Sequence, residues 1–413
     1  MGQQDTPGGT REHRAGATPR RPRLVSVDLA RLLALLGMFA AHLIHPVPGD
    51  GPGGVDGLFQ LVAGRSSALF ALLAGVSLAI TSREAAAAPG SHRRQLLVRA
   101  AAVGAIGLGL GLLHSGVAVI LVYYALLFCC ALPVLTWGAR PLLVLALGWG
   151  LLSPVVSLLL RPLLPATTQQ VPSVLSLLDP AQLLSELLVT GYYPALTWAT
   201  YVFAGLAVGR LLAPRGTTLS DDQVPRQLAS RLTLVGGWLA LLALAVSRLV
   251  ARPEQVRATL VETAGAQGWS ELSTTLRRGF YGVHPEGSAW WLGIWAPHSG
   301  STVDLAHTTG FALLVLGLCW WLVRLLPVVP WHLVAGAGAM TLTLYTLHVI
   351  ILGSPLGDPG QPLARGSAGA VGLHSLIALL VGTTFALLRR PGPLEALVRR
   401  LTGRGRPEEE PGR

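Results

Sequence analysis

Four polar side chains in one otherwise apolar stretch are the residues of this chain best placed to do chemistry. Asp28 and Arg31 stand three residues apart near the start of the run RLLALLGMFAAHLIHP, and His42 and His45 stand three residues apart at its end. On a helix, each pair shares a face. Ionisable groups are costly inside a membrane-spanning helix, so they indicate a functional site by default. Because histidine exchanges protons near neutral pH, this segment predicts acid–base chemistry.

Other ionisable side chains lie within or beside apolar runs further along the chain. Arg65 is flanked by glycine and serine, and a buried guanidinium needs an anionic partner. Asp304 precedes His307 by three residues, a spacing that would let the carboxylate fix the tautomer of the ring and raise its basicity. His298 and His348 complete the set. Each residue also has a structural alternative, such as a neutral imidazole bonded to a helix carbonyl, and both readings stay open here.

The composition indicates that the elements holding these groups are membrane-spanning helices. The 413 residues are 51% hydrophobic and 12% charged, with a mean hydropathy of +0.55, whereas a soluble domain carries about 25% charged residues. Apolar runs of about 20 residues recur, each long enough to cross a bilayer. We therefore predict an all-α, polytopic integral membrane protein with about ten transmembrane helices. The predicted helices cover residues 24–45, 58–81, 96–114, 117–136, 141–160, 195–212, 231–250, 304–326, 332–353 and 370–388.

The arginines predict the orientation of the chain. All 31 basic residues are arginines, and with the amino terminus inside, 22 lie in cytoplasmic segments and seven in outer segments. Because positive charge gathers on the cytoplasmic side, we expect a plasma-membrane protein with both termini in the cytoplasm. The net charge of +11 has the same explanation and predicts no nucleic-acid partner. Residues 1–22 are expected to form a disordered basic tail, 23–390 the transmembrane domain, and 391–413 a cytoplasmic tail with basic and acidic residues.

This topology brings most of the polar side chains to one side of the membrane. The first helix runs outward, and the second and eighth helices begin outside, so their ionisable groups belong to the outer leaflet. Eight such groups, six of them histidines, are expected to gather there in a single pocket, whereas Asp28 and Arg31 lie near the inner surface. The eight are His42, His45, Arg65, His114, His298, Asp304, His307 and His348.

Two predicted outer loops contain structure of their own. The stretch DPAQLLSELLVTG predicts a short helix with Asp179 as N-cap, Pro180 in the first turn, Gln182 completing a capping box and Gly191 at the end. It is too short to span, so we expect an interfacial or re-entrant helix. The longest loop, residues 251–303, ends in AWWLGIWAPHSGSTVD, and its tryptophans are expected in the interfacial aromatic belt. These are Trp290, Trp291 and Trp295.

Several common types of site have no signature in this sequence. No phosphate-binding loop, G-x-S-x-G or H-E-x-x-H motif occurs, and no G-x-G-x-x-G pattern follows a strand. Cys129, Cys130 and Cys319 lie in apolar runs without the spacing of a metal site and are expected to be small core residues. We therefore predict neither a metal nor a bound cofactor.

Several blocks resemble the catalytic-domain family of heparan-α-glucosaminide N-acetyltransferase, which belongs to the transmembrane acyltransferases. The first block is RLVSVDLARLLALLGMFAAH, which ends at His42, although Leu32 stands where the family has glycine. The second is GRSSALFALLAGVSLAI, which includes Arg65. Three later blocks, TGYYPALTWATYVFAGLAVGR, APHSGSTVDLAHTTG and MTLTLYTLHV, are similar to those of actinobacterial members. The resemblance covers most of residues 23–390.

The resemblance implies that an acetyl or other acyl group moves from acetyl-CoA in the cytosol to an acceptor outside, such as an amino sugar or cell-envelope glycan. Acetyl-CoA would be a co-substrate. Animal members place an active-site histidine in the loop after the first helix, but residues 46–57 contain none. His42, His45 or a histidine from another block would then take that role.

Each candidate residue has an expected role in this chemistry. His42 would act as general base or carry the acyl group, and Arg65 would bind donor phosphate or stabilise the thioester oxyanion. Asp28 and Arg31 would shape the inner mouth of a donor tunnel. The remaining assignments are His298, Asp304 and His307 as further catalytic residues, His45, Tyr192, Tyr193 and His348 as substrate-binding residues, and Arg93, Arg94 and Arg99 as the basic face that attracts the donor.

Two other classes of function remain open. A transporter or lipid translocase would need ionisable groups near the middle of the membrane and, often, broken helices. A non-enzymatic membrane protein would tolerate replacement of His42 by alanine, which would stop turnover in an enzyme. The expected partners are the lipid bilayer, an acyl-CoA donor and an extracytoplasmic glycan or amine, and the oligomeric state, including a homo-oligomer, is left open.

Overall fold

The computed structural model describes residues 24–44, 55–82, 89–214, 220–366 and 368–403. Within these ranges the chain forms helices and no strand, which confirms the all-α class. Three predictions fall on residues outside these ranges: the amino-terminal tail (residues 1–22), the role of His45, and the end of the carboxy-terminal tail (residues 404–413).

All ten predicted apolar segments coincide with helical segments. Among the described residues, seven helices are long and apolar enough to span a membrane, and two further apolar helices are shorter. The polytopic architecture is thereby confirmed. The helices of the bundle are α1 (Val25–Leu43), α3 (Arg65–Thr81), α4 (Pro89–Leu110), α5 (Leu121–Ala131), α6 (Ala139–Leu160), α8 (Ala195–Leu212), α9 (Arg226–Val250), α12 (Thr302–Leu325), α14 (Thr341–Leu352) and α15 (Ala368–Leu387).

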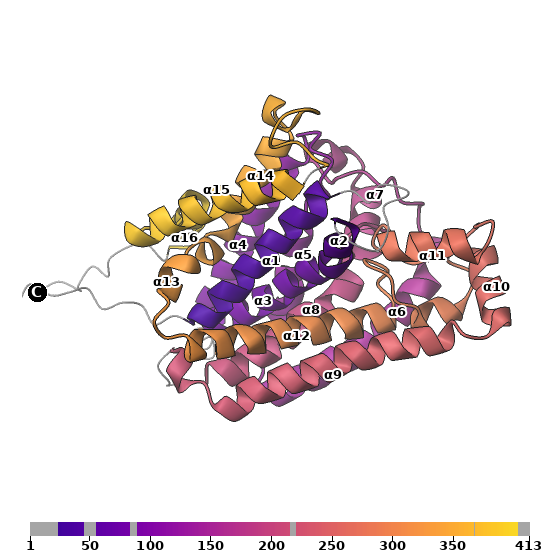
Figure 1. Ribbon diagram of the computed structural model, residues 1–413, viewed down its shortest axis with the longest axis horizontal. Coiled ribbons are helices and arrows are strands. Elements are labelled where there is room, and N and C mark those ends of the chain that lie inside the picture. Colours follow the sequence, from indigo (N-terminus) through magenta and orange to yellow (C-terminus); the bar gives the residue numbers. More distant parts are fainter. Residues whose placement is uncertain (1–23, 45–54, 83–88, 215–219, 367, 404–413) are drawn as a thin grey trace, which may run out of the picture.

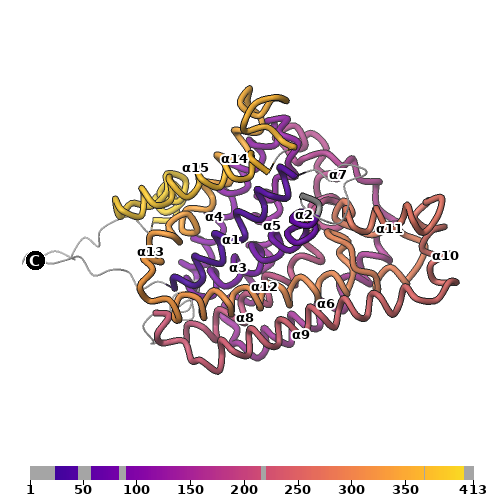
Figure 2. Tube along the Cα trace, viewed as in Figure 1, coloured from indigo at the N-terminus to yellow at the C-terminus, as the bar shows by residue number. Residues whose placement is uncertain are grey.

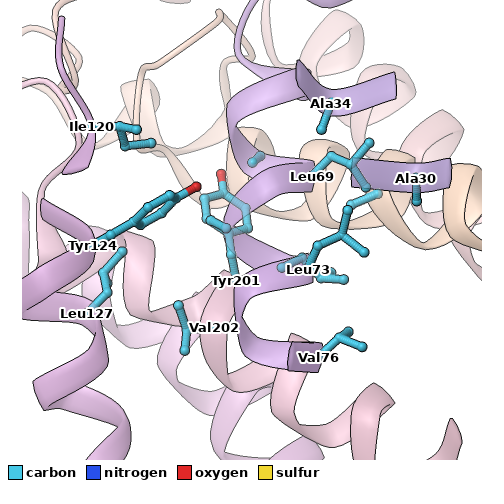
Figure 3. Packing of buried hydrophobic residues seen from close by; sticks show 14 of the residues in the cluster. Ala30, Ala34, Leu69, Leu73, Val76, Ile120, Tyr124, Leu127, Tyr201 and Val202 are labelled. Carbon is cyan, nitrogen blue, oxygen red and sulfur yellow. The ribbon is translucent and has the colours of Figure 1, made fainter. Parts of the chain in front are cut away.

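The centre of the bundle is α3, which packs against both α1 and α8 (Figure 1). Gly75 of α3 faces the backbone of α8 at Val202 and Gly205 so closely that a methyl group would collide there. Small residues allow membrane helices this close approach. Larger side chains, among them Leu73 and Tyr201, fill the space around the contact (Figure 3).

The periphery of the bundle is apolar. Helices α6, α9 and α15 expose many large hydrophobic side chains, including Leu147, Leu241 and Leu380. In the view of Figure 2, α9 and α15 lie at opposite edges of the molecule. A large exposed apolar surface of this kind is expected of helices that contact lipid.

Two predicted spans are interrupted. The second breaks at Gly64, whose φ is 72°, so that α2 (Val55–Val62) precedes α3. The ninth, expected as one helix over residues 332–353, consists of α13 (Trp331–Val334), the 3-10 turn η7 (Ala337–Ala339) and α14, so the expectation of a continuous helix is wrong. The glycines of this segment explain the break, because Gly338 packs directly on the backbone carbonyl of Asp28, where any side chain would collide.

Residues 251–301 form a cap segment with a small core of its own. It contains α10 (Glu254–Thr263), α11 (Trp269–Arg278) and the 3-10 helix η6 (Ala289–Gly293). In Figure 1, α10 and α11 lie at the end of the molecule away from the C-terminus. The buried residues of this core are Val256, Leu260, Leu272, Trp291 and Ile294.

One tryptophan of the expected interfacial belt lies in the core of the cap segment. Trp291 is fully buried and donates from Nε1 to the hydroxyl of Thr263 at 2.9 Å. Trp295 covers the guanidinium of Arg65, whose Cζ lies 4.8 Å from the ring centroid. Only Trp290, at 50% exposure, is open on the described surface. The prediction is wrong for Trp291, because the cap segment provides a core that the local sequence does not reveal, and it stays a prediction for Trp290 and Trp295.

The predicted short helix is present as α7 (Pro180–Ser185), which continues as one π-helical turn, Glu186–Thr190. The side chain of Asp179 accepts a hydrogen bond from the backbone N–H of Gln182 at 3.1 Å, which confirms the predicted N-cap. Gln182 does not complete a capping box with Asp179. Its side-chain amide instead donates to Glu186 at 3.0 Å, because this carboxylate lies one turn further along the same face.

The region predicted as a carboxy-terminal tail contains the helix α16 (Pro393–Leu401), which packs against α4 and α14. The side chain of Glu395 accepts hydrogen bonds from the backbone N–H groups of Leu342 at 2.9 Å and Thr343 at 3.2 Å. A carboxylate satisfies the open N–H groups at the start of a helix. Glu395 therefore ties α16 to the start of α14.

Candidate active site

Three histidines from three helices form a continuous chain of hydrogen bonds. Nδ1 of His42 in α1 lies 3.1 Å from Nε2 of His348 in α14. Nδ1 of His348 lies 2.9 Å from Nδ1 of His374 in α15, and Nε2 of His374 lies 3.1 Å from the backbone carbonyl oxygen of Leu363. His348 and His374 are buried, whereas His42 is half-buried. We call these three residues the histidine chain.

Aromatic rings pack around the histidine chain. The ring of Phe39 stacks on that of His348 with centroids 4.2 Å apart. The rings of His42 and His348 lie nearly parallel, with centroids 5.3 Å apart, and the edge of His42 meets Tyr345 at 6.4 Å. Packing of this kind restricts the rotation of each imidazole, so the order of the hydrogen bonds is maintained.

A cavity of about 320 Å³ lies beside the histidine chain. None of the three histidines lines the cavity among the described residues, but its lining includes Met38, which precedes His42 by one helical turn on α1, and Tyr345, whose ring contacts His42. Apolar side chains of α3, α4 and α5 form much of its wall. Sites for small molecules typically occupy about 300–1,000 Å³ and combine an apolar wall with a few polar groups.

Part of the cavity lining is basic. Arg31 of α1, Arg99 of α4 and Arg399 of α16 all contribute to its lining. Among the described lining residues the one carboxylate is that of Glu395, which is already bonded to the start of α14. The cavity therefore carries a net positive charge.

A second, polar hollow between α4 and α16 adjoins the cavity. The two share Gln95 and Thr402 in their linings. The hollow adds Arg94 and Arg400 to the basic surface. Arginine forks match the oxygens of phosphate, so the two spaces together are suited to an anionic ligand with several phosphates.

The predicted pair of Asp28 and Arg31 is formed. Nη1 of Arg31 lies 2.6 Å from Oδ1 of Asp28, which is almost completely buried. Nη2 of Arg31 donates to the hydroxyl of Ser77 on α3. The carboxylate thus orients the guanidinium beside the cavity, and Arg31 is the member of the pair that lines it.

Arg65 belongs to a different cluster, between α3, α9 and α12. Its Nε donates to Nε2 of His307 at 2.8 Å, and its Nη1 donates to backbone carbonyls of α2. Nδ1 of His307 lies 3.0 Å from the carbonyl oxygen of Ala240, so both ring nitrogens are occupied. Trp295 covers the guanidinium, and Arg65 does not appear in the lining of the cavity.

Asp304 does not contact His307 in the way its spacing suggested. Oδ2 of Asp304 accepts a hydrogen bond from the backbone N–H of Gly300 at 3.0 Å, at the start of its own helix. Its Oδ1 is buried and has no hydrogen-bond partner among the described residues. The expectation that Asp304 fixes the tautomer of His307 is therefore wrong, because the carbonyl of Ala240 occupies Nδ1 instead. Asp304 remains close enough to Arg65 to stabilise its charge.

His298 lies in a buried aromatic cluster. Its ring centroid is 4.6 Å from that of Tyr192, 5.6 Å from that of Tyr193 and 6.3 Å from that of Trp198. The backbone at His298 has φ 56°, which is unusual for a residue with a side chain. Burial lowers the pKa of His298 to about 4, and its Nδ1 has no described hydrogen-bond partner. His298 is thus neutral at physiological pH.

The predicted site residues consequently form two groups. His42 and His348 come together beside the cavity, with Arg31 in its lining. Arg65, Asp304 and His307 form the second group, and the segment 297–307 links them to His298, Tyr192 and Tyr193. The expected single pocket is not what the described residues show, because the cavity beside His42 is lined by none of the second group.

Three residues of the first group were missed from the sequence: His374, Tyr345 and Arg399. His374 gave the same signal as His42, a histidine inside an apolar run, and that signal was available. Tyr345 and Arg399 carry no such signal, since tyrosine is common near membrane surfaces and arginine in cytoplasmic segments.

The comparison with known families identifies the family of this chain. Residues 23–245 match the family model described as heparan-alpha-glucosaminide N-acetyltransferase, catalytic. No curated protein matches the chain. The matched region contains Asp28, Arg31, His42 and Arg65, whereas His348 and His374 follow it in the sequence. Because the match spans more than half of the 413 residues, the chain belongs to the family of the heparan-α-glucosaminide N-acetyltransferase catalytic domain.

Proposed function

We propose that this protein transfers an acetyl or other acyl group from a coenzyme A thioester in the cavity to an amine or hydroxyl acceptor at His42. One observation carries the proposal. The cavity lining combines three arginines with apolar side chains and with Tyr345, which contacts the ring of His42. A donor with anionic phosphates and a less polar thioester arm fits a lining of this composition.

The donor would bind through its phosphates. Arg31, Arg99 and Arg399 come from three different helices, and the adjoining hollow adds Arg94 and Arg400. Charge-assisted hydrogen bonds from arginine to phosphate are among the stronger polar interactions in proteins. These residues lie at the end of the bundle that the arginine distribution predicts to be cytoplasmic, which is consistent with a cytosolic donor.

The chemistry requires one proton acceptor and one group that stabilises negative charge. His42 would take a proton from the acceptor amine or hydroxyl while the nitrogen or oxygen of that acceptor attacks the thioester carbonyl. The carbon–sulfur bond then breaks, and the proton passes to the departing thiolate. The hydroxyl of Tyr345 accepts a hydrogen bond from the backbone N–H of Ile120 at 3.4 Å, so its own proton is available to the oxyanion.

The second group of polar residues is a candidate for the acceptor side. Tyr192 and Tyr193 offer aromatic rings of the kind on which sugar rings stack, and His298 lies against both. Arg65 is held by His307 away from the cavity, so we assign it to this side and not to the donor phosphates. An amino sugar or envelope glycan remains the acceptor class that we propose.

The direct test uses purified full-length protein in lipid vesicles, acetyl-CoA labelled in the acetyl group, and a panel of amino sugars and short glycans. We expect His42→Ala to retain donor binding and to lower the transfer rate by about 10²–10⁴-fold. His332→Ala is the matched control, because His332 is exposed on α13 and touches neither group. If labelled acetyl never reaches an acceptor or the protein while the donor binds, the proposed function is wrong.

A transporter is the second candidate function, because transporters often contain broken helices and the segment from α13 to α14 is interrupted. The same vesicles distinguish this second candidate. A transporter would move unmodified solute across the membrane without consuming acetyl-CoA, whereas the proposed enzyme consumes one donor for each acceptor modified.

A further inference from the structure

One end of the histidine chain is a group that can only accept a hydrogen bond. The carbonyl oxygen of Leu363 lies 3.1 Å from Nε2 of His374, so that nitrogen must carry a proton. In a neutral His374, Nδ1 is then unprotonated and accepts from Nδ1 of His348. Nε2 of His348 is in turn unprotonated and accepts from Nδ1 of His42.

This order of hydrogen bonds determines the tautomer of His42. Its proton lies on Nδ1, and its Nε2 is a proton acceptor. Whichever group meets Nε2 must therefore be a hydrogen-bond donor.

Burial supports the neutral forms on which this order depends. His348 is 1% exposed and His374 is 2% exposed, and a charged imidazole at either position would lose almost all of its hydration. Phe39 covers one face of His348 with an apolar ring. His42 is the half-buried member of the histidine chain.

The loop that carries the carbonyl of Leu363, which fixes the direction of these hydrogen bonds, is attached to α1. The backbone N–H of Gly366, three residues after Leu363, donates to the carbonyl of Leu43 at 2.8 Å. Leu43 is the residue that follows His42. Arg365 donates to the carbonyl of Ser115, which attaches the same loop to a second point of the bundle. The loop that carries the carbonyl of Leu363 is thus attached both to the residue next to His42 and to the turn at Ser115.

We propose that His348 and His374 are positioning residues, which together with the carbonyl of Leu363 lock His42 in the tautomer whose Nε2 is the base. The use of that nitrogen rests on the proposed acyltransferase function. The tautomer itself does not, since it follows from hydrogen bonds that exist without any substrate.

The first test measures the tautomer directly. Full-length protein with ¹⁵N-labelled histidine is placed in lipid vesicles, and solid-state NMR distinguishes protonated from unprotonated ring nitrogens, with His42→Ala used to assign the signals. We expect a protonated Nδ1 and an unprotonated Nε2 for His42. A protonated Nε2 on His42 in the wild type would overturn the proposal.

Two substitutions of His374 separate positioning from packing. His374→Asn keeps an oxygen near the position of Nδ1 that can accept from His348, so His42 should keep its tautomer. His374→Ala removes the acceptor, and His42 should become a mixture of tautomers. If the ¹⁵N signals of His42 were unchanged in His374→Ala, the histidine chain would not control the tautomer of His42, and the proposal would be wrong.

Kinetics provides a second readout. We expect His374→Ala to lower kcat by about 10–100-fold, as for partners that orient a reactive histidine, with the donor Kd unchanged. His374→Asn should stay close to wild type, and His332→Ala is again the control. Equal loss of kcat in both His374 variants would indicate a structural role and contradict the proposal. If the NMR pattern is as expected but no acyl transfer occurs, the positioning stands and the proposed function fails.

Discussion

Arg65 donates through Nε to Nε2 of His307 at 2.8 Å, while Nδ1 of the same ring lies 3.0 Å from the carbonyl oxygen of Ala240. The carbonyl requires a proton on Nδ1, and this leaves Nε2 unprotonated to accept from the guanidinium. His307 therefore cannot act as a base without releasing Arg65. Its role is to join α3, α9 and α12 around a buried cation.

Replacement of His307 should affect stability more than chemistry. His307→Leu leaves a donor of Arg65 unsatisfied in a buried site, which is expected to cost about 1–3 kcal/mol of unfolding free energy. His307→Gln retains an acceptor that can reach Arg65 and should lose less. Thermal unfolding in detergent measures both, with His332→Leu as control. Equal stability of His307→Leu and wild type would contradict this role.

The contact between α3 and α8 should not tolerate even one added carbon. A Cβ at Gly205 would meet the backbone carbonyl of Leu72, which cannot move without displacing the helix. We expect Gly205→Ala to reduce stability by about 1–3 kcal/mol.

Gly148 on α6 is the matched control for Gly205. A Cβ at Gly148 has no neighbour within 4 Å, so Gly148→Ala should be neutral or stabilise the protein by up to about 1 kcal/mol. The comparison of the two thermal unfolding midpoints checks the prediction. It is contradicted if the two variants behave alike.

Charge reversal of an arginine in the cavity lining should weaken donor binding. Arg399→Glu removes a phosphate partner and introduces repulsion, and the loss of one charge-assisted hydrogen bond corresponds to about a ten- to hundredfold higher Kd for acetyl-CoA. Isothermal titration with the purified protein measures the effect. Arg277→Glu on the exposed side of α11 changes the net charge equally and should leave Kd unaltered. Equal effects of the two variants would show that only overall charge matters.

The buried histidines of the cap segment should make the fold sensitive to acid. Burial lowers the pKa of His298 to about 4, and burial together with the Arg161 guanidinium lowers the pKa of His284 to about 4, from the ordinary value of 6.5. Between pH 4 and pH 6.5, His284 and His298 bind protons in the unfolded chain but not in the folded chain. Stability should thus be complete above pH 6.5 and fall as the pH drops toward 4.

His298→Asn tests this pH dependence. Asparagine tolerates the positive φ at this position and does not titrate between pH 4 and 7. The unfolding midpoint of the variant should therefore decrease less steeply than that of wild type between pH 6.5 and 4.5. Parallel curves for the two proteins would contradict a contribution from His298.

The features predicted correctly from the sequence are those that depend on residues close together in the chain. The apolar runs were long enough to identify the helices, the i,i+3 spacing predicted the ion pair of Asp28 and Arg31, and Asp179 was recognised as an N-cap. Each of these interactions is completed within one helical turn, so local spacing suffices to predict it.

Predictions that depended on the surroundings of a residue were less successful. Trp291 suits a membrane interface by type, but the core of the cap segment buries it. The break before α14 follows from the close contact of Gly338 with Asp28, whose partner segment is far away in the chain. Packing of this kind is decided by what lies opposite a residue, which its own neighbours do not encode.

By itself, the sequence determined that this chain crosses the membrane several times and that a histidine stands on the first helix, one turn beyond Met38. Only the tertiary structure decided which groups that histidine meets. His42 and His348 are 306 positions apart, and His374 comes from yet another helix. A hydrogen bond between two imidazoles requires the donor and acceptor nitrogens to lie within about 3 Å of each other. Spacing along one helix sets the face on which a side chain lies, whereas the packing of three helices sets the distance between their rings.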